Sequence, residues 1–260
     1  MTGDKSLFSH KVNKSEIPVC RILGVNIAAI DMEWLLNFTN EHIHELSGDY
    51  MCVSNVHTTV TAFEDPEYCR IQNCGILAIP DGGPLSTVGH QRGYKKMKRT
   101  TGPSYMGEIL KISVEKGYSH FFYGSTDETL KKLSEKISED YPGLNIAGMY
   151  SPPFRSLTKQ EDKKVIEMIN NTHPDFVWVG LGAPKQELWM ADHQGKIDGF
   201  MIGVGAAFDY FAGNISRAPK WMQKCNLEWL YRLMQDPKRL FKRYWHTNRK
   251  FIWNAYIKGR

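Results

Sequence analysis

The sequence lacks the hydrophobic segments that mark membrane-spanning or exported chains. None of its 260 residues belong to an uninterrupted apolar run of the roughly 18 residues that a spanning helix needs. The first residues, MTGDKSLFSHKVNKSE, contain no apolar stretch resembling a signal peptide. We therefore expect a cytoplasmic protein. A content of 42% hydrophobic and 23% charged residues is ordinary for a folded chain and argues against general disorder.

Cysteine is scarce, and its arrangement excludes two classes of small stabilised domain. The five cysteines are odd in number and form no CxxC pair. A disulfide framework and a zinc site are therefore not expected, and reduced thiols are the simpler interpretation. The residues concerned are Cys20, Cys52, Cys69, Cys74 and Cys225.

The local motifs that bind nucleotide cofactors or catalytic metals are also missing. The chain has no GxxxxGK[ST], no HExxH and no DxD. The glycine pairs Gly180/Gly182 and Gly203/Gly205 both lack the third glycine of a dinucleotide fingerprint. We expect no cofactor and no bound metal. Any diphosphate charge would then be met by arginine, lysine or helix N-termini.

Positive charge and aromatic rings are in excess at the C-terminal end. From Arg217 to Arg260 there are twelve Lys or Arg, two acidic residues and four of the seven tryptophans, a local charge of +10 in a chain of net charge +5. Such a segment suits an anionic membrane surface, at roughly 1 kcal/mol per basic residue. It suits nucleic acid or a phosphorylated substrate as well.

Short apolar runs alternate with helical patterns, which predicts an α/β fold: a Rossmann-like, mostly parallel sheet with helices on both faces. A helix should begin after Asp31, and another helical stretch should break at Pro66. Strands are expected at 22–27, 50–54, 76–79, 120–123, 144–149, 176–180 and 200–204, and helices at 105–116, 127–139, 159–170 and 185–191.

The alternation of strands and helices stops near Gly213. We expect residues 1–213 to form the α/β core and residues 214–260 to form a helical, basic and aromatic appendage. Pro237 should divide this appendage into short helices. Arg232, Arg239 and Arg243 would share one face if the segment were helical throughout.

Polar or glycine-rich loops follow four of the expected strands, where parallel sheets bind ligands. The loops span residues 55–58, 81–84, 180–187 and 203–209. Asp81 directly follows a strand and could act as a general base. It could equally stabilise its own turn. Asn55 and His57 also follow a strand, although a single histidine is more often structural.

Seven stretches together resemble the WecG/TagA/CpsF family of glycosyltransferases, family 26, from about Cys20 to Trp245. They are SNVHTTV, PDGGP, TGPSYM, GLGAPKQE, GVGAAFDYFAG, RAPKWM and LEWLYRL followed by PKRL and RY. The resemblance implies an inverting enzyme that moves a sugar from a UDP-sugar donor to a polyprenyl-diphosphate-linked glycan acceptor. The products would be teichoic acid, common antigen, capsule or exopolysaccharide. It also implies a peripheral position on the inner face of the cell membrane, with the appendage completing the active site and contacting the anionic bilayer.

The resemblance assigns roles to individual residues. Asp81 corresponds to the aspartate of the DG motif, the family's catalytic base. Substrate-binding roles fall to Asn55, His57, Gly102, Gln186, Asp209, Arg232, Arg239 and Arg243, with Lys242 as the alternative to Arg243. The chain departs from the family pattern at two places, with Val53 in place of threonine and DGGP in place of DGxG. The DGxP and NVHT forms look closer to the exopolysaccharide branch.

The expected function is therefore metal-independent transfer of a hexose or N-acetylhexosamine-type sugar. A nucleic-acid-binding protein that uses the basic tail is the alternative, and the glycosyltransferase interpretation requires no nucleic-acid partner. The sequence leaves the donor sugar, the acceptor glycan and the oligomeric state open, a homo-oligomer included.

Overall fold

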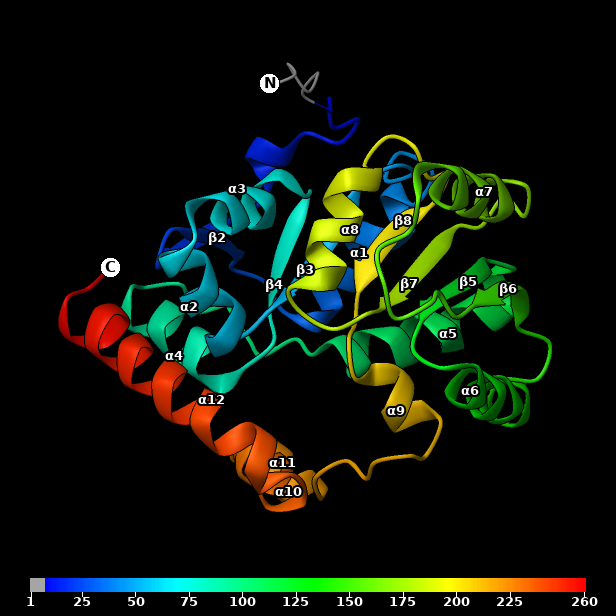
Figure 1. Cartoon of the computed structure of the whole chain (residues 1–260). Helices are drawn as coiled ribbons and strands as arrows, with labels where there is room; N and C mark the ends of the chain where they lie inside the picture. The colour runs from blue at the N-terminus through cyan, green and yellow to red at the C-terminus, as the bar shows by residue number, and fades with distance from the viewer. Residues whose placement is uncertain (1–7) are drawn as a thin grey trace.

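The protein is built on one six-stranded parallel sheet. The computed structural model describes residues 8–260, apart from the side chains of Lys224 and Arg239. Across the sheet the strands follow the order β4 (Leu77–Pro80), β3 (Tyr50–Ser54), β8 (Phe200–Gly203), β7 (Phe176–Gly180), β5 (Ser119–Gly124) and β6 (Asn145–Tyr150) (Figure 1). All of these pairings are parallel, as the sequence pattern predicts.

Successive strand residues point into two separate apolar layers. On β3, Met51 and Val53 join one buried cluster, while Tyr50 and Cys52 join the other. The first layer is covered by α1 (Met32–His42), α5 (Gly102–Lys116), α6 (Asp127–Asp140) and α9 (Ala207–Phe211). The second is covered by α2 (Val56–Glu64), α3 (Pro66–Cys74), α4 (Gly83–Gln91), α7 (Lys159–Asn170) and α8 (Lys185–His193). The prediction of helices on both faces is confirmed.

Side-chain caps fix where several helices begin. The Asp31 carboxylate accepts a hydrogen bond from the Trp34 amide, so the helix predicted after Asp31 is present. Asp65 ends α2 and caps α3, whose first residue is Pro66. The predicted break at Pro66 is therefore confirmed.

Two local predictions are wrong. Residues 22–27 form an antiparallel hairpin, β1 (Val19–Ile22) and β2 (Val25–Ala28), instead of one strand. The turn residues Leu23 and Gly24 have φ angles of 50° and 91°, as two-residue hairpin turns require. Such turns commonly have the sequence Asn-Gly, and the leucine at the first position made this one unrecognisable from the sequence. The four predicted loops are not entirely loops either, because helices start inside them, at Val56, Gly83, Lys185 and Ala207. Helix α4 accommodates Pro84 in its first turn.

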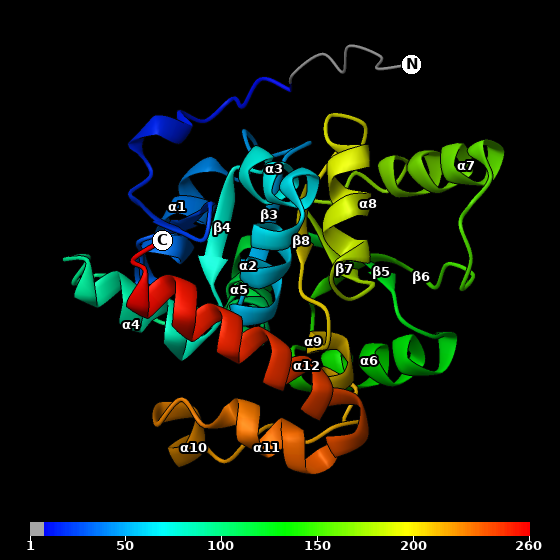
Figure 2. The ribbon, with the colours of Figure 1, turned by 60° about the vertical axis from the view of Figure 1, so that its left-hand side comes forward.

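The appendage consists of α10 (Lys220–Lys224), α11 (Glu228–Gln235), α12 (Pro237–Phe251) and a π-helical turn (Ile252–Ile257). The predicted division at Pro237 is confirmed. Figure 2 shows α12 lying along α2, with α10 and α11 on its other side. Phe251 and Ala255 pack into the second apolar layer, so part of the appendage belongs to the hydrophobic core. Within residues 8–260, no helix is long and apolar enough to cross a bilayer.

Phe251 should carry much of the attachment of α12. Its side chain is 1% exposed, whereas Trp253, two residues later, is 53% exposed. Phe251→Ala should lower the free energy of unfolding by about 3–5 kcal/mol, because it removes a buried ring and leaves a cavity. The control Trp253→Ala should change it by no more than about 0.5 kcal/mol. Urea denaturation measures both, and equal losses would contradict this packing.

Candidate active site

Asp81 lies at the carboxyl edge of the sheet, directly after β4. Its amide donates to the carbonyl oxygen of Ser54, at the end of β3, at 2.7 Å. This bond ties the position of Asp81 to two strands. Helix α4 has Gly82 as its N-cap and no side-chain cap, and no described residue donates a hydrogen bond to the Asp81 carboxylate. The carboxylate is therefore not used to stabilise its own turn.

The surroundings of Asp81 raise its pKa to about 6. Burial is the main cause, and the negative charge of Glu228 acts in the same direction. Arg99, Arg232 and Arg217 oppose the shift. Of these four charged residues, only Arg99 belongs to the core, so the appendage places most of the charges around this carboxylate.

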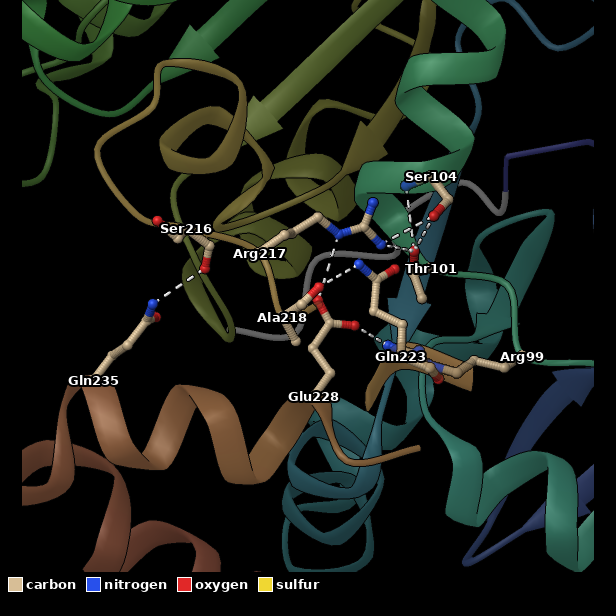
Figure 3. Close-up of polar contacts among 9 residues, drawn as sticks. All are labelled: Arg99, Thr101, Ser104, Ser216, Arg217, Ala218, Gln223, Glu228 and Gln235. Carbon is tan, nitrogen blue, oxygen red and sulfur yellow. Dashed lines mark hydrogen bonds and ion pairs between the residues drawn. The ribbon is translucent and has the colours of Figure 1, made fainter. Parts of the chain in front are cut away.

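Glu228 joins the appendage to the core (Figure 3). Its carboxylate accepts hydrogen bonds from Arg99 in the core and from Nε of Arg217 in the appendage, the latter at 3.4 Å. Arg217 Nη2 also donates to Ser104 Oγ at 3.0 Å and to Thr101 Oγ1 at 3.3 Å. Because Thr101 caps α5, this network connects α11 to the start of a core helix.

Further polar contacts hold the appendage against the core (Figure 3). Arg99 Nη1 donates to the carbonyl oxygen of Gln223 at 3.2 Å, and Gln223 Nε2 donates to that of Ala218 at 2.6 Å. Asn226 packs directly on Gly83, where an added Cβ would lie 2.4 Å from the Asn226 Cγ. The glycine at position 83 therefore makes room for the appendage.

The structure brings two predicted arginines to different parts of this edge. Arg232, on α11, lies near Asp81, and its guanidinium carbon is 5.8 Å from the centre of the Tyr210 ring. Arg243, on α12, lies near His57, and its Nε is buried without a hydrogen-bond partner among the described residues. Lys242 is exposed, so the geometry favours Arg243 over Lys242 as the third basic residue of the appendage at this site. The side chain of Arg239 lies outside the described part.

His57 is placed beside the site as an uncharged ring. Burial, followed by the positive charge of Arg243, lowers its pKa to about 4. Its Nδ1 is buried and has no hydrogen-bond partner in the part of the chain that the structure describes. His57 can therefore exchange a hydrogen bond with a ligand near neutral pH but does not act there as a cation.

Asn55 adjoins the DG motif and also has a structural role. Its Oδ1 accepts from the amides of His57 at 3.0 Å and Thr58 at 3.2 Å, which caps α2. A Cβ added to Gly82 would lie 3.9 Å from the Cβ of Asn55. Asn55 is thus next to Asp81 in space, with its amide nitrogen as the remaining polar group.

The Gln186 side chain bonds to the glycine-containing loops that follow β7 and β8. Its Oε1 accepts from the amide of Gly182 at 3.1 Å, and its Nε2 donates to the carbonyl oxygen of Gly203 at 3.0 Å. Nε2 also donates to Glu187 Oε1 at 2.9 Å. The side chain is 4% exposed. Gln186 therefore sets the relative position of the loops after β7 and β8, in place of presenting a free amide.

Gly102 is the first residue of α5, and Asp209 lies on α9. A Cβ on Gly102 would lie 3.3 Å from Val53 Cγ1, so glycine allows α5 to approach β3 closely. Asp209 is half-buried on α9, and its Oδ1 accepts from Asn214 Nδ2 at 3.1 Å.

Sequence reasoning missed the residues that connect the appendage to the core: Arg99, Tyr210, Arg217 and Glu228. One signal was present, since Glu228 is one of only two acidic residues in a strongly basic segment. Such an isolated carboxylate needs cations around it. No motif indicated that one partner would be Arg99, which lies 129 residues earlier in the chain.

Among the described residues, no group of three or more His, Cys, Asp or Glu side chains could hold a metal ion. A surface hollow of about 550 Å³ lies away from Asp81, between the β1–β2 turn and the end of α2, with Leu23, Ala62 and Arg92 among its walls.

Comparison with known proteins agrees with the resemblance. Residues 20–260 match the glycosyl transferase WecG/TagA/CpsF family. The chain is 31% identical over 206 residues to N-acetylglucosaminyldiphosphoundecaprenol N-acetyl-beta-D-mannosaminyltransferase of Bacillus subtilis (strain 168), covering 78% of each protein. It is 28% identical over 225 residues to the protein of the same name from Staphylococcus aureus (strain MW2), covering 84% of this chain and 85% of that one. On this evidence the chain belongs to the WecG/TagA/CpsF family of glycosyltransferases.

Proposed function

We propose that this glycosyltransferase moves a hexose or N-acetylhexosamine-type sugar from a UDP-sugar to a polyprenyl-diphosphate-linked glycan, with inversion, in cell-surface polysaccharide synthesis. The observation that carries the proposal is the Asp81 carboxylate, which has a raised pKa, no hydrogen bond from a described residue and appendage arginines around it. The names of the relatives favour N-acetylmannosamine as the sugar and a GlcNAc-diphospholipid as the acceptor.

Asp81 acts as the general base in this mechanism. It takes the proton from the acceptor hydroxyl while that oxygen attacks the anomeric carbon from the face opposite to UDP. The bond between the sugar and the diphosphate breaks, UDP leaves with the electron pair, and the configuration at the anomeric carbon inverts. A pKa of about 6 suits this role, because the carboxylate is ionised at neutral pH and still basic enough to accept a proton.

Arginines offset the charge that develops on the leaving diphosphate. Glu228 already neutralises part of the charge of Arg99 and Arg217, whereas the Arg232 guanidinium forms no ion pair with any described residue. Arg232 and Arg243 are therefore the cations left for phosphate oxygens, with Arg239 added by the resemblance. We infer that the reaction needs no divalent metal.

The appendage also supplies a surface for the anionic membrane. Its exposed aromatic side chains include Trp221, Trp245 and Trp253, which are 61%, 61% and 53% exposed among many basic residues. Large rings beside lysine and arginine suit the headgroup region of a bilayer. Peripheral attachment to the inner face of the membrane would bring the site to an acceptor whose lipid is already there.

Asp81→Asn should lower kcat by about 10²–10⁴-fold and leave KM for the donor nearly unchanged, because it removes only the base. The wild-type rate should fall as pH drops through about 6, when Asp81 becomes protonated. Both the kcat of the variant and the pH profile of the wild type are measured as UDP release, with a polyprenyl-diphosphate-GlcNAc acceptor and excess chelator. Asp198→Asn, an exposed carboxylate elsewhere, is the control. Full activity of Asp81→Asn contradicts the mechanism, and activity only with added metal contradicts metal independence.

The same substitution should stabilise the fold above pH 6. Because burial raises the folded-state pKa of Asp81 from 3.8 to about 6, its ionised form disfavours folding at higher pH. The neutral asparagine removes this cost. Asp81→Asn should therefore melt at a higher temperature than wild type at pH 8, with a difference that shrinks as pH falls from 6 towards 4. Thermal unfolding at both pH values tests this, and a lower melting temperature at pH 8 would indicate a structural aspartate.

Replacing Trp221, Trp245 and Trp253 together with serine should weaken binding to anionic vesicles by about tenfold or more, since the interfacial rings are lost. Turnover of a short-chain, water-soluble acceptor should persist. Phe154→Ser, 86% exposed on the core, is the matched control. Vesicle sedimentation measures the binding. Unchanged binding of the triple variant would mean that the appendage does not form the membrane surface.

A further inference from the structure

Tyr210 links the core to both appendage arginines near Asp81. It lies on α9, which follows β8, and its ring centre is 5.8 Å from the guanidinium carbon of Arg232 and 6.0 Å from that of Arg217. Both distances are within the range of cation–π attraction. One ring in the core therefore contacts guanidinium groups from two separate segments of the appendage.

The two arginines differ in what else holds them. Arg217 is also bound by Glu228, Thr101 and Ser104. The Arg232 guanidinium has no ion pair and no hydrogen bond with any described residue, so the Tyr210 ring is the contact that fixes it. Arg232 is nevertheless close enough to Asp81 to lower the pKa of that carboxyl.

A guanidinium held by cation–π attraction remains able to bind phosphate. This attraction acts on the positive charge and needs no hydrogen bond, whereas the N–H edge of the group matches phosphate oxygens in pairs. An ion pair to a protein carboxylate would occupy that edge. Holding Arg232 by an aromatic face thus places the cation near Asp81 and leaves its hydrogen-bond donors unused.

The hydroxyl of Tyr210 is not the part of the side chain that contacts the arginines. It is buried and has no hydrogen-bond partner among the described residues. Burial raises its pKa to about 12, so it stays protonated and does not serve as a base. Since the hydroxyl has no partner there, the contacts of Tyr210 with the two arginines come from its ring.

We propose that Tyr210 is a positioning residue for diphosphate recognition, whose ring holds Arg232 beside Asp81 with its N–H edge free for substrate phosphate. The inference rests on the proposed function and extends it to a residue outside the substrate contacts. It also connects α9, which carries Asp209, to the phosphate-binding arginines of α11.

The test compares Tyr210→Phe, which keeps the ring, with Tyr210→Leu, which removes it, in the full-length protein. Tyr210→Phe should keep KM for the diphosphate substrates within about twofold. Tyr210→Leu should raise that KM by about tenfold. It should also move the acid limb of the pH profile to higher pH, because Arg232 no longer lowers the pKa of Asp81. Arg99, Arg217 and Glu228 also face Asp81. Tyr210→Leu removes the ring contact of Arg217 but not its hydrogen bonds to Glu228, Thr101 and Ser104, and Arg99 keeps its bond to Glu228.

A second comparison separates positioning from general packing. In an Arg232→Gln background, Tyr210→Leu should cause no further rise in KM, since the group it positions is already gone. Additive losses, or a Tyr210→Leu variant with wild-type KM and pH profile, would overturn the proposal. If Tyr210→Leu does not fold, the Phe variant decides the question: a tenfold rise in its KM would assign the role to the hydroxyl.

Binding of inorganic pyrophosphate by calorimetry keeps this inference distinct from the proposed function. Wild type and Tyr210→Phe should bind pyrophosphate equally, and Tyr210→Leu about tenfold more weakly. That pattern without any sugar transfer would support the role of Tyr210 and contradict the proposed reaction. Transfer activity with equal pyrophosphate binding in all three proteins would support the proposed reaction and contradict the role of Tyr210.

Discussion

The position of the appendage depends on the buried carboxylate of Glu228, which lies between Arg99 of the core and Arg217 of the appendage. Removing one member of such a group leaves uncompensated charge in a poorly solvated place, which costs far more than an exposed ion pair gains. Glu228 also raises the pKa of Asp81 directly and offsets guanidinium charges that would lower it. The ion pairs that assemble the site therefore adjust its chemistry as well.

The arginines at this edge divide according to what they contact. Arg99 and Arg217 are bound to Glu228 and to backbone or hydroxyl oxygens, so their donors serve the fold. Arg232 and Arg243 rest on aromatic or histidine neighbours and keep donors available. The strong positive charge of the last 44 residues is thus divided among ion pairs that hold the fold, guanidinium groups with free donors and exposed side chains.

The sequence predicts the parallel sheet, the cap at Asp31, the break at Pro66 and the place of Asp81, because each depends on local periodicity or on a neighbouring residue. It does not predict the turn at Leu23, where burial of the leucine side chain stabilises an unfavourable backbone conformation. Nor does it predict the contacts of Arg99, Tyr210 or Gln186. These depend on which side chains the sheet and the appendage bring together, and no local pattern encodes distances across the fold.

The packing of α12 has a geometric consequence. Phe251 fixes this helix to the same core that carries Asp81, while Trp245 and Trp253 stay exposed. If that exposed side rests on a flat surface, the Asp81 carboxylate stands at one fixed height above it. Under the proposed function, an acceptor sugar would then be selected by how far its hydroxyl projects from the lipid. A glycan one unit too long would not react, even without a contact that recognises its identity.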